Sequence, residues 1–405
     1  MAPTSLPGGG FGVYTTRHLD PGEAILAAPD GPAVPLWDPS KNSPQLQAFR
    51  HTYWWSNGAG DFNLLTGGDV TDNQNTLGAL PNHHCMLSTI QVQLPDVEYD
   101  DSVANRFVDP GAGAFSYGLG REFTSDGRAV QAGEELFLSY VPCDERIPAS
   151  NTKLFGWQHD IPLTEHFLQA AHMVQDVWRK AQTANVTRDE RIEWPRNHRT
   201  NHHVAPLLPA TYGDVESIVQ HAVSLSSQDL AVQVAKHALP QRSVDWIQQH
   251  GVCIEHLVPL PSIIPQAGMG GVAQFGVQKG EVVVPAPLLH MDRRNAMDMH
   301  LHDDEESPRG KQLLLNYCLG HEDSDILLYP DTNAILINHC SNRGQFAQYC
   351  PDGPNAAFQW SSGWDPMSEE WKRLSVDEIM KRTVRGLSME VVALRDIQPG
   401  TQMLA

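Results

Sequence analysis

The feature of this sequence that most constrains its fold is an internal repeat of long period. Each copy opens with a Gly-x-Gly segment, which ends at Gly12 in the first copy and at Gly270 in the second. A Gly-Glu turn follows, and then an Asn-His pair, 70 residues after Gly12 and 68 residues after Gly270. A third segment closes each copy, at residues 130–137 and 397–404. Because three elements recur in one order at similar spacing, we expect two domains of the same fold.

Local patterns divide the chain into three regions. Residues 1–148 carry short apolar runs between Gly- and Pro-containing turn signals, which is typical of short strands joined by loops. Residues 149–250 place apolar side chains at helical spacing. Residues 251–405 return to a strand pattern. We therefore expect a mainly β fold with helical insertions, in which a helical linker or insertion joins a first and a second domain with these boundaries.

Two helix starts can be placed from capping patterns. Ser243 precedes a short apolar-periodic stretch that Gly251 ends, which predicts a short helix between them. Ser375 and Glu378 form a capping-box pattern, which predicts a second short helix over residues 375–382.

The composition is that of a folded, acidic protein. Of 405 residues, 41% are hydrophobic, and 28 Lys and Arg against 48 Asp and Glu give a net charge of −20. A chain this acidic repels phosphate backbones, so we expect no direct binding of nucleic acid. The same charge favours a basic partner, such as a peptide rich in Lys and Arg; alternatively, it only keeps the protein soluble.

The cysteines and the apolar runs bear on the compartment. Six cysteines show no C-x-x-C pair and no regular framework, which indicates a reducing compartment, although a disulfide between distant cysteines stays open. No apolar stretch approaches the ~20 residues of a membrane span. The first ten residues lack the charged and apolar regions of a signal peptide. We expect an intracellular protein of the cytoplasm or nucleus that does not enter a membrane.

The ordered elements resemble the signature of the SET domain of protein-lysine methyltransferases. That pattern begins with Gly-x-Gly on a strand, continues to Asn-His-x-Cys and closes with Gly-Glu-Glu-Leu-x-x-Asp-Tyr. The first copy matches it at Gly10-Phe11-Gly12, at Asn82-His83-His84-Cys85 and from Gly133 to Tyr140. The second copy matches it at Gly268-Met269-Gly270, at Asn338-His339-Cys340 and, in truncated form, from Gly400 to Leu404.

The resemblance implies a fold, a reaction and a site. The fold would be two SET-like β-clip domains, each with a C-terminal segment that threads past an earlier loop as a pseudoknot. The cofactor would be S-adenosylmethionine, and the substrate a lysine side chain in a basic protein or peptide. The implied catalytic residue is Tyr140. The implied cofactor-binding residues are Gly10, Gly12, Asn82, His83, Gly268, Gly270, Asn338 and His339.

The chemistry explains these residue types. Methyl transfer from a sulfonium is an in-line displacement, so positioning supplies much of the catalysis. The amine must be neutral, and burial lowers the pKa of a lysine. Glycines let the backbone approach a cofactor closely, and a phenol at Tyr140 would lie near the transferred methyl. Each residue also has a structural interpretation: tight turns for the glycines, satisfied loop backbone for the Asn-His pairs, and the end of a core strand for Tyr140.

Departures from the pattern motivate a second functional hypothesis. Ser139 replaces the family's Asp, and the Pro-Asn pair expected soon after Asn-His-x-Cys comes only at Pro354-Asn355 in the second copy. The sequence stops at Ala405, before a second closing Tyr, which predicts a second cofactor pocket that is incomplete at that wall. The alternative function is a non-catalytic SET-like module that holds a basic peptide or partner.

Other clusters predict no further chemistry. His198, His202 and His203 lie in a polar segment, and His300 and His302 lie beside four acidic residues. We interpret both as solvated loops rather than metal sites. No Gly-x-Ser-x-Gly motif supports a hydrolase.

Overall fold

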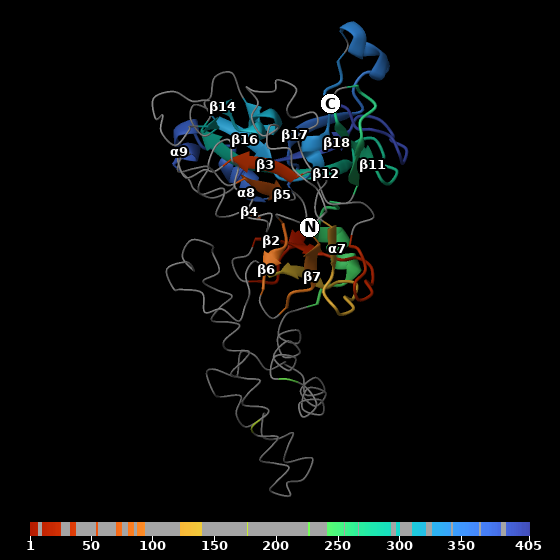
Figure 1. The fold of residues 1–405 in the computed structure, drawn as a ribbon, viewed down its shortest axis with the longest axis vertical. Coiled ribbons are helices and arrows are strands. Elements are labelled where there is room, and N and C mark those ends of the chain that lie inside the picture. Colours follow the sequence, from red (N-terminus) through yellow and green to blue (C-terminus); the bar gives the residue numbers. More distant parts are fainter. Residues whose placement is uncertain are drawn as a thin grey trace, which may run out of the picture.

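A computed structural model of the 405-residue chain describes part of it: residues 1–6, 10–25, 33–37, 54–55, 70–74, 80–84, 87–93, 122–139, 176, 226, 241–254, 256–265, 267–292, 297–299, 310–320, 326–341, 343–363, 366–381 and 386–405. Tyr140, both histidine clusters and nearly all of the predicted helical region 149–240 lie outside the described residues. The described strands gather in two groups, one built around β2 and β9 and the other around β12 (Figure 1). The described fold is mainly β, as the sequence predicts.

The first group is a small mixed sheet. Its strand order is β1 (Ala2–Pro3), β2 (Phe11–Tyr14), β9 (Glu135–Leu138) and β6 (Asn82–His83). β2 runs antiparallel to β1 and β9, whereas β6 runs parallel to β9. The antiparallel pair of β7 (Ile90–Gln93) and β8 (Glu122–Ser125) belongs to the same group, because β7 contacts β9.

A buried apolar core holds the first group together, and the segment after the next helix contributes to it. Val13, Leu19, Val130 and Leu136 are among the buried residues of this core, and Ile254 packs with them. The segment 251–254 therefore packs on the first group, although the sequence pattern placed it at the start of the second domain.

The helix predicted to begin after Ser243 is present as α7 (Val244–His250). The Ser243 hydroxyl accepts a hydrogen bond from the Trp246 N–H at 3.1 Å, and the helix ends at Gly251. Ile247 packs against Ala2 and Tyr14, so the helix covers β1 and β2 of the first sheet.

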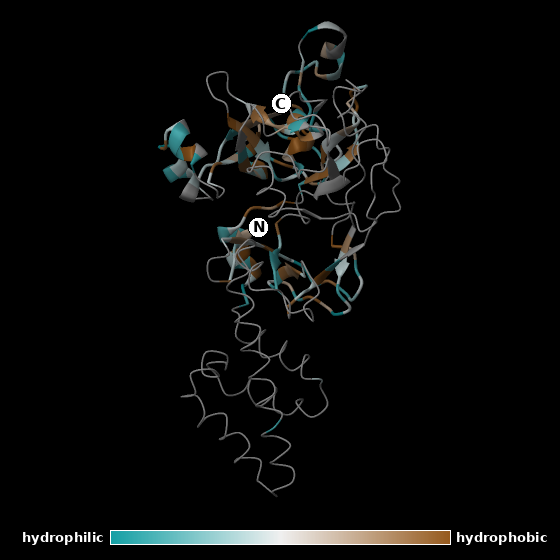
Figure 2. Ribbon diagram, turned by 60° about the vertical axis from the view of Figure 1, so that its left-hand side comes forward, coloured by the Kyte–Doolittle hydropathy of each residue, from teal (hydrophilic) through white to brown (hydrophobic). Residues whose placement is uncertain are grey.

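The second group contains a larger antiparallel sheet. Its order is β15 (Leu319–Gly320), β16 (Ile326–Pro330), β12 (Val282–Asp292), β18 (Ser388–Ala393) and β17 (Ala356–Trp360). β10 (Leu257–Pro261) pairs with β11 (Met269–Ala273), and β13 (Asp298–Met299) pairs with β14 (Gly310–Lys311). Hydrophobic residues are concentrated on the strands (Figure 2).

Short helices border the second group. They are the 3-10 helices η6 (Leu313–Tyr317), η7 (Asn333–Leu336) and η8 (Gly344–Tyr349), with the α-helices α8 (Pro366–Trp371) and α9 (Val376–Met380). The capping box predicted for Ser375 and Glu378 is confirmed at the start of α9. Trp371 is fully buried and packs with Leu288 and Ile379, which fixes both α-helices against β12.

A three-stranded sheet from the first half of the sequence lies beside the second group. Its order is β3 (Ala33–Trp37), β5 (Val70–Gln74) and β4 (Trp54–Trp55), all antiparallel. β3 contacts η6, and Figure 1 draws the sheet among the strands of the second group. The insertion between the first Gly-x-Gly segment and the first Asn-His pair therefore connects the two groups.

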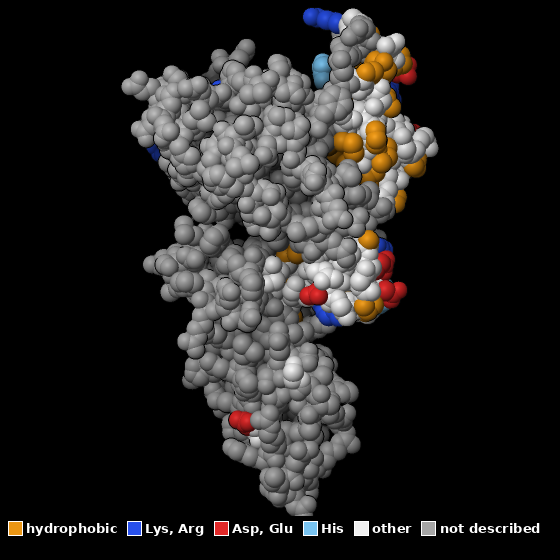
Figure 3. Space-filling view, viewed as in Figure 1, with side chains coloured by type: hydrophobic (Ala, Val, Ile, Leu, Met, Phe, Trp, Pro, Cys, Tyr) orange, Lys and Arg blue, Asp and Glu red, His pale blue; other side chains and the backbone are white. Residues whose placement is uncertain are grey.

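Three observations bear on the remaining expectations from composition. Cys340 and Cys350 form a disulfide, with Cα atoms 5.7 Å apart, where the cysteine pattern indicated a reducing compartment. Among the described residues, no helix is both long enough and apolar enough to cross a membrane. The exposed large apolar side chains among the described residues belong to the second group, and Figure 3 shows apolar side chains gathered on that part of the surface.

Candidate functional site

The two Gly-x-Gly segments make the same turn. The Gly10 carbonyl accepts a hydrogen bond from Thr4 N–H at 3.0 Å, and the Gly268 carbonyl accepts one from Ser262 N–H at 2.8 Å. Gly10 has φ 68° and Gly268 has φ 65°, a left-handed conformation that other residues rarely adopt. A Cβ atom added at Gly10 would meet no atom within 4 Å, so this glycine borders open space.

The asparagines of the two Asn-His pairs occupy corresponding places. Asn82 donates from Nδ2 to the Phe11 carbonyl at 3.1 Å, and Asn338 donates from Nδ2 to the Met269 carbonyl at 3.0 Å. In both cases the acceptor is the middle residue of Gly-x-Gly. Each asparagine also lies in a parallel bridge to a closing segment, by which we mean residues 134–138 in the first half and 401–405 in the second.

A buried carboxylate joins these elements in the first half. Glu135 accepts hydrogen bonds from Asn82 Nδ2 at 3.1 Å, from Ser5 N–H at 3.1 Å, and from the hydroxyls of Ser5, Thr4 and Tyr14. The residue is only 7% exposed. A buried carboxylate is stable only where hydrogen-bond donors surround it, and each of these groups donates a hydrogen bond to Glu135. Glu135 therefore fixes β1, β2, β6 and β9 to one another.

Gln402 takes this place in the second half. Its Oε1 accepts from Ile263 N–H at 2.7 Å, and its Nε2 contacts the Ser262 hydroxyl at 2.9 Å. The amide is 5% exposed. Asn338 donates to the same Ser262 hydroxyl at 3.3 Å rather than to Gln402. The second network thus has a similar arrangement, but its central side chain is a neutral amide instead of a carboxylate.

These two side chains explain the second glycine of each motif. A Cβ atom at Gly12 would lie 2.1 Å from Glu135 Oε1, and one at Gly270 would lie 2.6 Å from Gln402 Nε2. Both distances are far below van der Waals contact. Gly12 and Gly270 therefore leave room for a side chain of the closing segment, whereas Gly10 leaves open space.

Tyr14 lies at the inner edge of this network. Its hydroxyl is 2.9 Å from the Pro3 carbonyl and 3.1 Å from Glu135 Oε2. Burial, followed by the neighbouring Glu135 charge, raises the pKa of Tyr14 far above its ordinary value. The phenol therefore stays protonated and acts as a donor, which is a structural role.

The histidines of the first Asn-His pair are buried and neutral. Burial lowers the pKa of His83 to about 4 and that of His84 to about 3. His84 Nδ1 accepts a hydrogen bond from Leu87 N–H at 3.1 Å, and its ring contacts Phe137. In the second half, by contrast, His339 is exposed. The two Asn-His pairs therefore agree at the asparagine and differ at the histidine.

Each closing segment is held on its second side by a residue that the sequence analysis did not assign. In the first half, Phe137 N–H donates to Thr89 Oγ1 at 2.7 Å and the Phe137 carbonyl accepts from Thr89 N–H at 2.9 Å. In the second half, Leu404 N–H donates to Asn355 Oδ1 at 2.8 Å and its carbonyl accepts from Asn355 N–H at 3.1 Å. The displaced Pro354-Asn355 pair was the available signal for the second of these.

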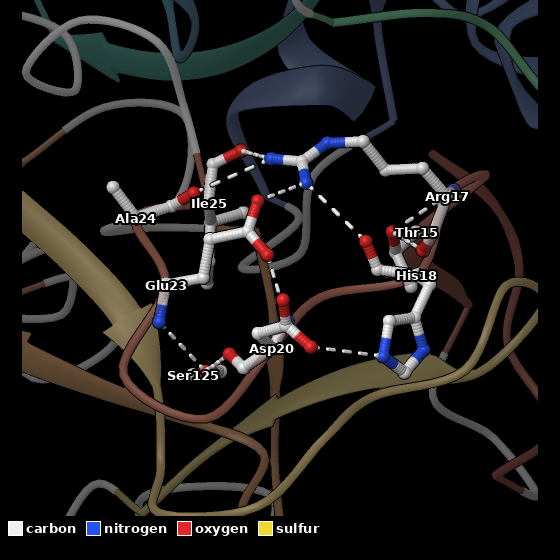
Figure 4. Close-up of polar contacts among 8 residues, drawn as sticks. All are labelled: Thr15, Arg17, His18, Asp20, Glu23, Ala24, Ile25 and Ser125. Carbon is white, nitrogen blue, oxygen red and sulfur yellow. Dashed lines mark hydrogen bonds and ion pairs between the residues drawn. The ribbon is translucent and has the colours of Figure 1, made fainter.

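The Gly-Glu turns are equivalent as well. Glu23 Oε2 accepts from Asp20 N–H at 2.7 Å, and Glu281 Oε2 accepts from Gln278 N–H at 2.7 Å. Arg17 adds an ion pair to Glu23 in the first half only, as Figure 4 shows. The Asp20 N–H and the Arg17 side chain lower the pKa of the Glu23 carboxyl. The cluster is exposed, so we interpret it as a reinforced turn rather than a site.

A cavity of about 270 Å³ is lined in part by Val13 and Tyr14 of β2. Its lining residues include Thr15, Leu136, Ile247 and Cys253. Gly10, Asn82 and His83 are not among its lining residues, so it is distinct from the predicted site.

The structure thus brings Gly10 and Gly12, at the start of β2, near Asn82 and His83 of β6, since β2 and β6 both pair with β9. It brings Gly268, Gly270 and Asn338 together in the same way, with His339 at the surface. Among the described residues, no group of three or more His, Cys, Asp or Glu could hold a metal ion. The predicted catalytic Tyr140 directly follows the described Ser139 but lies outside the described residues.

Comparisons with known proteins add little to this geometry. No family model matches the chain, and no curated protein matches it. Among solved structures, it is similar to a crystal structure from Plasmodium falciparum described as a "putative histone methyltransferase". The two are 22% identical, with a TM-score of 0.22, over 37% of this chain and 90% of the other.

Proposed function

We propose that the chain is an S-adenosylmethionine-dependent protein-lysine N-methyltransferase of the SET type, built from two SET-like copies, with Tyr140 as the catalytic residue of the first. The observation that carries this proposal is the Asn82 side chain. It ties the middle of Gly-x-Gly to the closing segment that leads into Tyr140. Three motifs that resemble one signature thus meet in space, although 53 or more positions separate them in sequence.

In this proposal the cofactor lies beside Gly10 in the first half. The space beside Gly10 is open, whereas the space beside Gly12 is filled by Glu135. Gly10 and Asn82 would hold S-adenosylmethionine, which supplies an activated methyl group when bound. The network around Glu135 would keep these residues fixed, so that little ordering is needed on binding.

The substrate would be a lysine in a basic segment. A net charge of −20 attracts such a segment and raises its rate of association. The amine must lose its proton before it can attack the methyl group, and burial lowers its pKa. Tyr140 would orient that amine with its hydroxyl.

Calorimetric titration with S-adenosylmethionine, followed by methyl transfer to lysine-rich peptides, tests the proposal. Substituting Tyr140→Phe removes only the hydroxyl, so transfer should fall by on the order of 10²-fold or more while cofactor binding and folding stay unchanged. Tyr349→Phe, at a tyrosine of η8 without an assigned role, is the matched control and should keep full activity. The same peptides with Arg in place of Lys should accept no methyl groups.

Two results would contradict the proposal. Peptide binding without cofactor binding would exclude the enzyme and favour the non-catalytic module. Equal methyl transfer by wild type and Tyr140→Phe would exclude Tyr140 from the mechanism.

A further inference from the structure

The closing segment of the second half is held from two sides. On one side, Ala405 N–H donates to the Asn338 carbonyl at 3.0 Å and Cys340 N–H donates to the Ala405 carbonyl at 2.7 Å. On the other side, Asn355 contacts Leu404 through its backbone and its side chain. Asn355 is 4% exposed, so water cannot readily replace these bonds. The chain between Cys340 and Asn355 is therefore the loop that surrounds the closing segment.

That loop differs in length between the two halves. In the first half, the two flanking residues are His84, whose N–H donates to Leu138, and Thr89, which contacts Phe137. They are five positions apart, whereas Cys340 and Asn355 are fifteen positions apart. A longer loop costs more entropy to close and holds the segment less firmly.

The disulfide shortens the path around the second closing segment. Cys340 and Cys350 are 10 positions apart, and η8 (Gly344–Tyr349) lies between them. From Cys350 to Asn355 the chain advances five positions, the same number as from His84 to Thr89. Across the cross-link, the covalent path around the second closing segment is thus the disulfide, whose Cα atoms are 5.7 Å apart, plus five positions, instead of fifteen positions.

We propose that the Cys340–Cys350 disulfide is a redox-sensitive clamp on the closing segment of the second half. When it is oxidised, it holds Asn338 and Asn355 on either side of that segment. When it is reduced, the fifteen-position loop loosens, the segment detaches at Leu404 and Ala405, and the Asn338 end of the second site loses its order. The clamp does not depend on methyl transfer.

The chemical step is thiol–disulfide exchange with a dithiol reductant. A thiolate of the reductant attacks one sulfur of the pair, the Cys340–Cys350 bond breaks, and one cysteine leaves as a thiolate. The second thiol of the reductant then displaces the other cysteine. The protein gains two thiols with the protons of the reductant, which leaves as a cyclic disulfide.

Hydrogen exchange of the full chain, followed by mass spectrometry, tests the clamp. We compare wild type with the double variant Cys340→Ser, Cys350→Ser. Loss of a cross-link over a loop of this length should accelerate exchange at Leu404 and Ala405 by about 10- to 100-fold and lower the melting temperature of the second group by about 5–10 °C. The Met403 N–H bonds to Gly271 of β11, so its exchange should change less.

Three comparisons make the test decisive. Residues 135–138 of the first closing segment should keep wild-type exchange in the double variant. Cys253→Ser, at an exposed cysteine outside the disulfide, should behave as wild type throughout. Wild type that is folded first and then treated with dithiothreitol should match the double variant at residues 404–405, which settles the matter even if the variant folds poorly. Unchanged protection of these residues after reduction would overturn the clamp.

Discussion

Gly12→Ala separates the two explanations of the Gly-x-Gly motif. If Gly12 serves only to admit a cofactor, alanine should weaken cofactor binding and leave the free protein as stable as wild type. If Gly12 leaves room for Glu135, alanine should destabilise the free protein. Gly12 is not among the glycines with positive φ, so alanine can adopt its backbone conformation and the substitution reports on space alone.

The expected magnitude follows from the contact. The new Cβ would lie 2.1 Å from Glu135 Oε1, so the carboxylate must move by more than about 1 Å to reach van der Waals separation. That movement breaks the bonds from Asn82 and Thr4 to Oε1. Each bond to a charged acceptor contributes about 1.5–3 kcal/mol. Alanine recovers about 0.4–1 kcal/mol by restricting the unfolded chain. The net loss should be about 2–5 kcal/mol.

A double-mutant cycle assigns this loss to Glu135. On a Glu135→Ala background the space is empty, and Gly12→Ala should cost less than about 1 kcal/mol. Gly276→Ala is the matched control, because its nearest atom would be the Ile397 carbonyl oxygen at 3.8 Å. The free energy of local opening is measured by hydrogen exchange at β9, since the two strand groups need not unfold together. Equal costs on both backgrounds would refute the steric explanation.

Two further predictions use other parts of the structure. With folded-state pKa values of about 4 for His83 and about 3 for His84, against about 6.5 in the unfolded chain, the unfolded state binds more protons below pH 6.5. Stability should therefore be full above pH 6.5 and fall towards pH 4 by about 1.4 kcal/mol per pH unit for each histidine. In urea titrations, His84→Asn, which keeps an acceptor for Leu87, should halve that slope, and an unchanged slope would contradict the assignment. Ser375→Ala should cost about 1 kcal/mol of local stability in α9, measured by hydrogen exchange, because it removes half of the capping box.

The sequence was informative where the determinants of structure are close together in the chain. The capping box of Ser375 and Glu378 spans four residues, and both Gly-Glu turns are closed by a side chain three positions away. The order and spacing of the repeat predicted two domains of the same fold, and the bonds of Asn82 to Phe11 and of Asn338 to Met269 correspond.

The sequence was uninformative where the determinants are distant. Glu135 contacts Thr4 and Ser5, which lie 131 and 130 positions away, and no periodicity connects them. Six cysteines allow 15 full pairings, so the partner of Cys340 could not be deduced. The role of Asn355 could not be predicted for a related reason. Ten additional positions separate it from the second Asn-His pair, and the disulfide spans those positions.

The difference between Glu135 and Gln402 gives the two halves different physical requirements. A buried carboxylate needs a full set of donors, and the first half supplies them from β1, β2 and β6. A neutral amide in the second half tolerates fewer partners, because an amide that loses one hydrogen bond costs less than a charge that does. The hydrogen bonds of Glu135 therefore make the first network the more rigid of the two. The second network depends on a disulfide between cysteines 10 positions apart. The proposed methyl transfer therefore belongs to the first half, whose network does not include Cys340. The proposed redox response belongs to the second half, where His339 of the Asn-His pair is exposed.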